Sequence, residues 1–166
     1  MVNQVNKSKT SKIAIGGMIA ALYVVLTWIA NLMGLASGAI QVRLSEALTI
    51  MPVFTASAVP GLTGGCVLAN LLTGCAAWDV VFGSVATLIG AVGTRLLKDK
   101  PLLAWIPPVV SNAAIVPVIL IKVYGVPDAW WFLVLTVGAG ELISCGLLGL
   151  LLWKTMQRIP QIRAME

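Results

Sequence analysis

Hydrophobic residues dominate this chain, and short polar stretches divide them into blocks. Positions 1–12 are polar, a charged turn lies at 95–101, and a basic tail follows Trp153. A helix that crosses a bilayer needs ~20 mostly apolar residues, and Pro60-Gly61 is typical of a break between two helices. The pattern therefore predicts six membrane-spanning helices, at 13–33, 44–59, 62–77, 79–96, 102–121 and 129–153.

The composition fixes the class of protein. Hydrophobic residues make up 59% of the chain and charged residues 10%, whereas about 25% of a soluble domain is charged. A chain with so few charges cannot cover a surface that faces water. We expect an all-α integral membrane protein with one transmembrane domain at 13–153, a polar tail at 1–12 and a basic tail at 154–166.

The basic residues predict the orientation of the helices. If the N-terminus is cytoplasmic and the six helices alternate, nine of the eleven basic residues lie inside, and only Arg43 and Lys122 lie outside. Lysine and arginine concentrate in the cytoplasmic loops of membrane proteins. We therefore expect both termini in the cytoplasm.

Several function classes are excluded by what the sequence lacks. The basic residues flank apolar segments and form no patch with interleaved aromatic residues, which argues against a nucleic-acid partner. Cys66, Cys75 and Cys145 have no metal-binding spacing and there is no histidine, so we expect no metal, no cofactor and no catalytic Cys/His pair. There is also no phosphate-binding loop, so the chain itself is not expected to be an enzyme that hydrolyses ATP.

A small set of polar residues interrupts the apolar segments. An ionisable side chain at the centre of a membrane helix costs about 2.5–3.5 kcal/mol on insertion scales, so such residues pair, contact water or bind a ligand. The predicted topology places Arg43, Glu46 and Asp79 near the outer face, with Trp78 beside them. It places Asn70, Asn112 and Glu141 nearer mid-depth. We expect a pocket that opens outward and is lined by Arg43, Glu46, Asn70, Trp78, Asp79, Asn112 and Glu141.

Each of these residues also has a purely structural interpretation. Glu46 follows Arg43 by three residues, so a salt bridge within one helical turn is an alternative. Asp79 is placed to cap the N-terminus of a helix. The structural alternative for Asn70 and Asn112 is that they form hydrogen bonds between helices. The alternative for Trp78 is a place in an ordinary interfacial aromatic belt. Glu141 has no basic residue at helical spacing, which favours a role in the pocket.

The first predicted helix carries small residues on adjacent faces. Small residues spaced four apart let helix backbones approach closely in lipid. They pack either within the protein's own bundle or against a partner protein. The residues are Gly16, Gly17, Ala20 and Ala21.

Three blocks of sequence extend the argument beyond hydropathy. They are RLSEALTIMP at 43–52, PGLTGGCVLANLLTG at 60–74 and WDVVFGSVATLIGA at 78–91. Together with GGMIAALYVVLT at 16–27, they resemble the QueT family of substrate-binding (S) components of energy-coupling factor (ECF) transporters, and the resemblance covers essentially the whole membrane portion.

The resemblance implies a multi-pass plasma-membrane protein with a six-helix S-component bundle. Its pocket would face outward, under a lid formed by the connection between the first two helices. The small residues of the first helix would dock onto a transmembrane coupling protein that works with two ATPases. The ligand would be a queuosine precursor, a 7-deazaguanine base.

The chemistry of that ligand assigns provisional roles. A carboxylate accepts both N–H groups of the guanine-like edge, for which we expect Glu141. Asn70 and Asn112 would donate to the ring carbonyl, Trp78 would stack on the ring, and Glu46 or Asp79 would meet a charged substituent. Arg43 would orient a carboxylate. The alternatives are an S component for another vitamin, such as a flavin, and a small channel or structural membrane protein.

Overall fold

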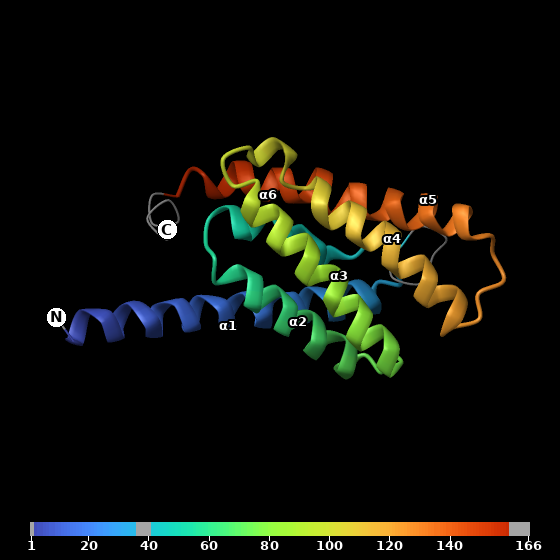
Figure 1. The fold of residues 1–166 in the computed structure, drawn as a ribbon, viewed down its shortest axis with the longest axis horizontal. Coiled ribbons are helices and arrows are strands. Elements are labelled where there is room, and N and C mark those ends of the chain that lie inside the picture. The colour runs from blue at the N-terminus through green and yellow to red at the C-terminus, as the bar shows by residue number, and fades with distance from the viewer. Residues whose placement is uncertain (1, 36–40, 160–166) are drawn as a thin grey trace.

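The computed structural model describes residues 2–35 and 41–159, and every regular element in these two ranges is a helix (Figure 1). The all-α prediction is confirmed. In chain order the elements are α1 (Val2–Leu32), the 3-10 helix η1 (Leu44–Val53), α2 (Ala58–Leu72), α3 (Ala77–Leu96), the 3-10 turn η2 (Pro101–Leu103), α4 (Ile106–Lys122), α5 (Trp130–Glu141), the π-helix η3 (Leu142–Leu148) and α6 (Gly149–Met156).

Four helical runs within the described residues are long and apolar enough to cross a membrane. They coincide with the first, fourth, fifth and sixth predicted segments, and α5, η3 and α6 form one continuous run. Their bounds are Lys9–Leu32, Ala77–Leu96, Pro101–Lys122 and Trp130–Met156. Large apolar side chains such as Leu22, Val81 and Leu135 are exposed along these runs, as expected for surfaces that contact lipid.

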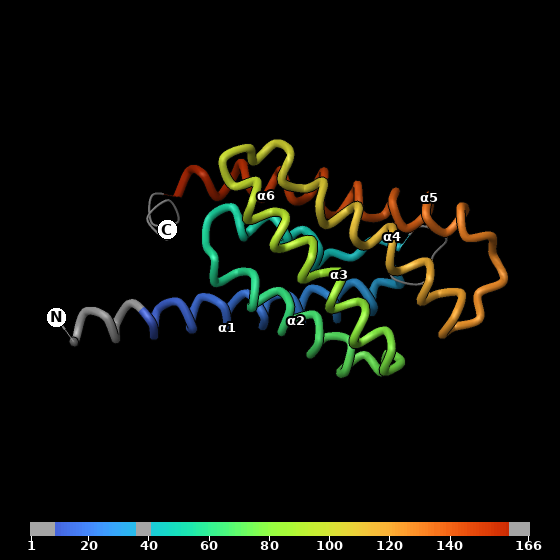
Figure 2. Tube along the Cα trace, in the orientation of Figure 1, coloured from blue at the N-terminus to red at the C-terminus, as the bar shows by residue number. Residues whose placement is uncertain are grey.

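The second predicted segment, 44–59, is not one of the four helices of membrane-spanning length. The chain there forms η1, which is short and buried along most of its length. It packs against α1, α3, η3 and α6, and in Figure 2 its cyan tube runs lengthwise through the bundle. A 3-10 helix rises ~2.0 Å per residue, so its ten residues extend roughly 20 Å. Such irregular backbone is tolerated at membrane depth because protein surrounds it.

Both ends of η1 are held by specific hydrogen bonds. Near its start, Thr49 Oγ1 donates to the Glu46 carbonyl at 2.6 Å. At its end, Arg95 Nη1 donates to the carbonyl oxygens of Pro52 and Val53 at 3.0 and 3.4 Å. The guanidinium thus satisfies carbonyls that no further helical turn reaches.

The predicted boundary at Pro60-Gly61 is also wrong. Pro60 lies in the first turn of α2, where a missing N–H removes no helical hydrogen bond. The break between η1 and α2 comes at 54–57 instead. The later turn between α2 and α3 contains Gly74, whose φ of +74° suits glycine. Pro107 and Pro108 likewise lie in the first turn of α4, while Pro117 is buried inside that helix.

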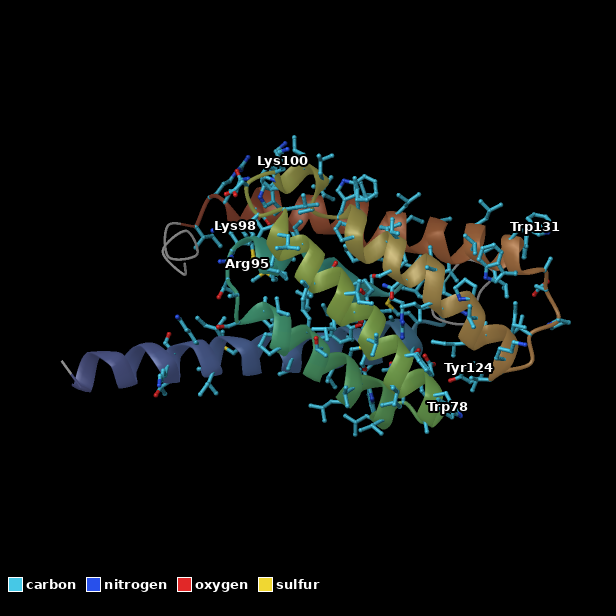
Figure 3. All side chains as sticks on the ribbon, viewed as in Figure 1. Trp78, Arg95, Lys98, Lys100, Tyr124 and Trp131 are labelled. Carbon is cyan, nitrogen blue, oxygen red and sulfur yellow. The ribbon has the colours of Figure 1, made fainter. Side chains whose placement is uncertain are left out.

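The bundle has two chemically different ends (Figure 3). The end that carries Arg95, Lys98 and Lys100 is also where α1 begins and α6 finishes; we call it the basic end. Trp78, Tyr124 and Trp131 lie at the opposite end, which we call the pocket end. This separation is the one that the predicted topology requires.

Candidate functional site

A pocket of about 350 Å³ lies at the pocket end of the bundle. Residues from the ends of α1, α2 and α4, the start of α3 and the segment before η1 line it. The lining residues are Thr27, Ala30, Asn31, Gln41, Arg43, Ser45, Asn70, Thr73, Cys75, Asp79, Leu120, Tyr124 and Val126. The pocket therefore contains three of the predicted site residues, Arg43, Asn70 and Asp79, and its volume lies within the range of small-molecule sites.

Polar contacts join these three residues into one chain across the wall of the pocket. Arg43 Nη2 donates to Asn70 Oδ1 at 3.5 Å, and Asn70 Nδ2 donates to the backbone carbonyl of Asp79 at 3.4 Å. The Tyr124 hydroxyl donates to Asp79 Oδ2 at 2.9 Å. Asn70 is buried and uses both ends of its amide, so it holds Arg43 and Asp79 in place from α2.

The start of α3 explains why Asp79 points into this site. Asp79 lies in the first turn, where the N-terminal partial charge of the helix favours a carboxylate. The N-cap residue is Ala76 and no side chain caps the helix, so the alternative that Asp79 is the cap is wrong. One turn further, a Cβ on Gly83 would lie 3.1 Å from Asp79 Oδ1 and 3.2 Å from Asn70 Nδ2. Glycine therefore leaves the room in which these two side chains meet.

Beneath the pocket lies a second polar group that is almost fully buried. Glu46 on η1 accepts a short hydrogen bond from the Tyr23 hydroxyl, and Glu141 Oε2 accepts from Cys145 Sγ at 3.2 Å. Asn112 lies beside Glu141. Among the described residues, Glu46 Oε2 and Asn112 Nδ2 have no hydrogen-bond partner. We call Tyr23, Glu46, Asn112, Glu141 and Cys145 the buried cluster.

Arg43 connects the buried cluster to the pocket. Its guanidinium lines the pocket and interacts electrostatically with both Glu46 and Glu141. One atom each of Glu46, Glu141 and Cys145 lie within 4.8 Å of one another, close enough to surround a metal ion. Hydrogen bonds from Tyr23 and Cys145 already occupy one oxygen of each carboxylate. Arg43 thus faces both buried carboxylates, each of which has one oxygen in a hydrogen bond within the cluster.

Trp78 does not lie in the pocket wall. Its indole stacks on Phe82, with ring centroids 5.8 Å apart, and lines a separate apolar groove with residues of α4. The side chain is 63% exposed. The aromatic ring that does line the pocket belongs to Tyr124.

Sequence reasoning missed both tyrosines. The chain has only two, and each donates its hydroxyl to a predicted site carboxylate, Tyr23 to Glu46 and Tyr124 to Asp79. A signal for this was present, because a phenolic hydroxyl inside an apolar segment needs a polar partner.

The small residues of α1 divide between two faces. A Cβ on Gly61 of α2 would lie 2.6 Å from the Gly16 carbonyl oxygen, and one on Gly65 would lie 3.0 Å from Ala20. Gly16 and Ala20 thus pack inside the bundle against α2. Gly17 and Ala21 are exposed on the adjacent face.

In the described residues, a helical bundle with four apolar helices of membrane-spanning length and a polar pocket at one end is typical of an integral membrane protein. The profile of the QueT transporter family matches residues 13–158. The chain therefore belongs to the QueT transporter family, and the family resemblance read from the sequence is confirmed.

One similar protein is the queuosine precursor transporter QueT of Lactococcus lactis subsp. cremoris (strain MG1363). It is 37% identical over 95 residues, which is 57% of this chain and 55% of the relative. The match thus spans little more than half the length of that protein. No solved structure matches the chain.

Proposed function

We propose that this transporter protein is the substrate-binding subunit of an ECF importer and that it binds a queuosine precursor of the 7-deazaguanine type. The observation that carries the proposal is the linked set Arg43, Asn70 and Asp79 in one pocket of a largely apolar bundle. The name of the Lactococcus lactis relative supports the ligand class.

The pocket offers a donor and an acceptor at separate points, as a guanine-like edge requires. The Arg43 guanidinium carries several N–H donors for the ring carbonyl. Asp79 receives the Tyr124 hydroxyl on Oδ2, so its Oδ1 is placed to accept from the ring N–H or the exocyclic amine of the ligand. The ring of Tyr124 provides an aromatic face at the same wall.

Glu141 takes a different role from the one that the sequence favoured. It is 3% exposed, lies behind Arg43 rather than in the pocket wall, and accepts from Cys145. We assign Glu46 and Glu141 to holding the guanidinium in place, since both carboxylates act on it from the buried side. Asn112, on α4, lies beside Glu141.

The chemical difference between the two ends of the bundle supports the proposed orientation. With the basic end in the cytoplasm, the pocket opens outward, as an importer's binding subunit needs. In this arrangement η1 and α2, which are both shorter than the four long helices, complete six passages of the chain. The exposed face of Gly17 and Ala21 would dock on the coupling protein, and the ATP would be hydrolysed by the partner ATPases.

Calorimetry on the purified, detergent-solubilised protein tests this function. We expect 7-deazaguanine to bind with 1:1 stoichiometry, and riboflavin, as a control vitamin, not to bind. Mass spectrometry of small molecules that co-purify with the protein gives an independent identification. Binding of riboflavin in place of the deazaguanine would indicate a binding subunit for another vitamin. Ion conductance in planar bilayers without any ligand binding would indicate a channel.

A further inference from the structure

The segment that enters η1 carries the arginine of the proposed site. Arg43 has φ −100° and ψ 98°, which is extended backbone, and it directly precedes the 3-10 helix. Gln41, Arg43 and Ser45 all line the pocket, as alternate residues of an extended chain point to the same side. Extended backbone makes no helical hydrogen bonds, so contacts with other elements must fix its position.

Two neighbouring elements hold this segment. The Arg43 backbone N–H donates to Ser144 Oγ of η3 at 3.2 Å, and that hydroxyl donates to the Gly140 carbonyl at 3.0 Å. From α1, Thr27 Oγ1 donates to Ser45 Oγ at 2.9 Å. Ser45 and Ser144 are both 0% exposed. Hydroxyl groups that are shielded from solvent therefore fix the backbone of this pocket wall.

The position of Ser144 depends on the π-helix within the last long helical run. The i→i+5 hydrogen bonds of η3 make a wider turn than those of an α-helix, and such turns are frequent at functional sites. Three consecutive residues, Ser144, Cys145 and Gly146, are buried there, while the side chains before and after them are less buried. Cys145 Sγ donates to Glu141 Oε2 at 3.2 Å. One turn thus contacts both Arg43 and a carboxylate that acts on its guanidinium.

Arg43 is held at its two ends. Its backbone N–H contacts Ser144, and its guanidinium donates to Asn70 Oδ1 at 3.5 Å. We propose that Ser144 is a positioning residue for Arg43, and that η3 sets the place at which the guanidinium meets the ring carbonyl of the ligand. Ser144 itself does not line the pocket. The inference rests on the proposed function and adds a residue that controls ligand recognition through another side chain.

A pair of ligands separates positioning from support of the fold. The probes are 7-deazaguanine and its analogue without the ring carbonyl, 2-amino-7-deazapurine, measured by calorimetry on the full-length protein in detergent. Wild type should bind the analogue at least tenfold more weakly, because Arg43 then has no ring oxygen to contact. Ser144→Ala should weaken binding of 7-deazaguanine at least fivefold and change binding of the analogue less than twofold. Ser144→Thr keeps the hydroxyl and should retain the wild-type ratio of the two affinities.

Thr94→Val is the matched control. Thr94 is also 0% exposed and donates its hydroxyl to the Ala104 carbonyl at 2.7 Å, but it lies next to Arg95 at the basic end. This variant should lower the melting temperature and leave both affinities within twofold of wild type. Equal weakening of both ligands by Ser144→Ala, or of neither, would overturn the proposal, as would an affinity ratio in Ser144→Thr as low as in Ser144→Ala. Failure of wild type to bind 7-deazaguanine would instead overturn the proposed function.

Discussion

The Tyr124 hydroxyl lies 2.9 Å from Asp79 Oδ2 and joins the end of α4 to the first turn of α3. The Tyr124 hydroxyl oxygen also accepts a hydrogen bond from the backbone N–H of Ala76 at 3.2 Å. One phenol therefore closes a side of the pocket and fixes the rotamer of the only carboxylate that lines it among the described residues.

Replacing Tyr124 by phenylalanine separates the hydroxyl from the ring. Tyr124→Phe keeps the aromatic face but removes the donor to Asp79, so ligand affinity should fall about threefold to tenfold, in line with ~0.5–1.5 kcal/mol for a hydrogen bond. Tyr124→Ala removes the ring as well and should cost at least tenfold. Calorimetry with one ligand on the three proteins decides between them: equal losses for both variants would mean that the ring makes no contact.

The stabilisation that the Tyr124 hydroxyl contributes should depend on pH, because the hydroxyl must be protonated to donate. Burial and the Asp79 acceptor raise the pKa of Tyr124 to about 12, against the lowering effect of the Ala76 N–H. Because this pKa is raised on folding, the stabilisation is complete below the ordinary tyrosine pKa of about 10 and is lost as the pH rises through the folded value. The melting temperatures of wild type and Tyr124→Phe should differ by a constant amount from about pH 6 to about pH 9. The difference should shrink only as the pH rises toward the raised pKa of about 12. A difference that is already lost near the ordinary tyrosine pKa of about 10 would contradict the raised value.

Gly83 is the residue through which packing controls the site. A Cβ there lies 3.1 Å from Asp79 Oδ1 and 3.2 Å from Asn70 Nδ2, so Gly83→Ala should push the two side chains apart and weaken binding at least fivefold. Gly64→Ala is the control, since a Cβ at Gly64 has no neighbour within 4 Å. It should bind normally and gain up to about 1 kcal/mol of stability from reduced backbone entropy. Equal affinity in both variants would show that Asp79 and Asn70 need not converge.

The contrast between η1 and the long helices shows which parts of the fold can be predicted from the sequence. Apolar runs predicted four helices correctly because lipid-facing helices need length and uniform hydropathy. The same signal misplaced the segment at 44–59, since hydropathy does not distinguish a helix that lipid surrounds from one that protein surrounds. The polar side chains of Glu46 and Thr49, both buried, were the residues that marked the difference.

Some features of the candidate site were also predictable from the sequence, and others were not. Arg43, Asn70 and Asp79 were predicted to meet, and they do, because polar groups in an apolar bundle gather where they can bond each other. The burial of Glu141 at mid-depth was predicted, but its absence from the pocket wall was not. That absence depends on the close approach of the segment before η1 to Gly140, where a Cβ would lie 2.1 Å from the Gln41 carbonyl oxygen. Long-range packing of this kind leaves no local pattern.

The roles of Asp79 and Glu141 are separated by a thermodynamic cycle. Asp79→Asn and Glu141→Gln should each weaken binding about tenfold to a hundredfold, the ~1–3 kcal/mol of a lost buried interaction. The cycle compares 7-deazaguanine with an analogue that lacks the exocyclic amine. If Asp79 accepts from that amine, wild type binds the analogue more weakly than 7-deazaguanine. This difference in affinity should disappear in Asp79→Asn and persist in Glu141→Gln. The opposite pattern would place Glu141 on the ligand edge, as the sequence alone favoured.

The orientation is open to labelling from one side of the membrane. Cys66 and Cys145 are buried, so a Cys75→Ala background leaves no accessible native thiol among the described residues. In that background, Lys122→Cys at the end of α4 should react with an impermeant maleimide on intact cells, and Lys100→Cys at the basic end only after lysis. Reversed labelling would show that the pocket faces the cytoplasm, which would contradict the proposed import function.

The neighbouring glycines of α1 provide the sharpest test of coupling to a partner. A Cβ at Gly17 meets nothing within 4 Å, whereas one at Gly16 would lie 3.1 Å from the Ser57 carbonyl oxygen. Gly17→Leu and Ala21→Leu should therefore fold and bind ligand as wild type does, yet abolish uptake in cells, because added bulk prevents close helix approach by the coupling protein. Gly16→Leu should instead destabilise the protein itself and lower its melting temperature in detergent. If Gly17→Leu supports normal uptake, or loses ligand binding along with it, this face of α1 is not the docking surface.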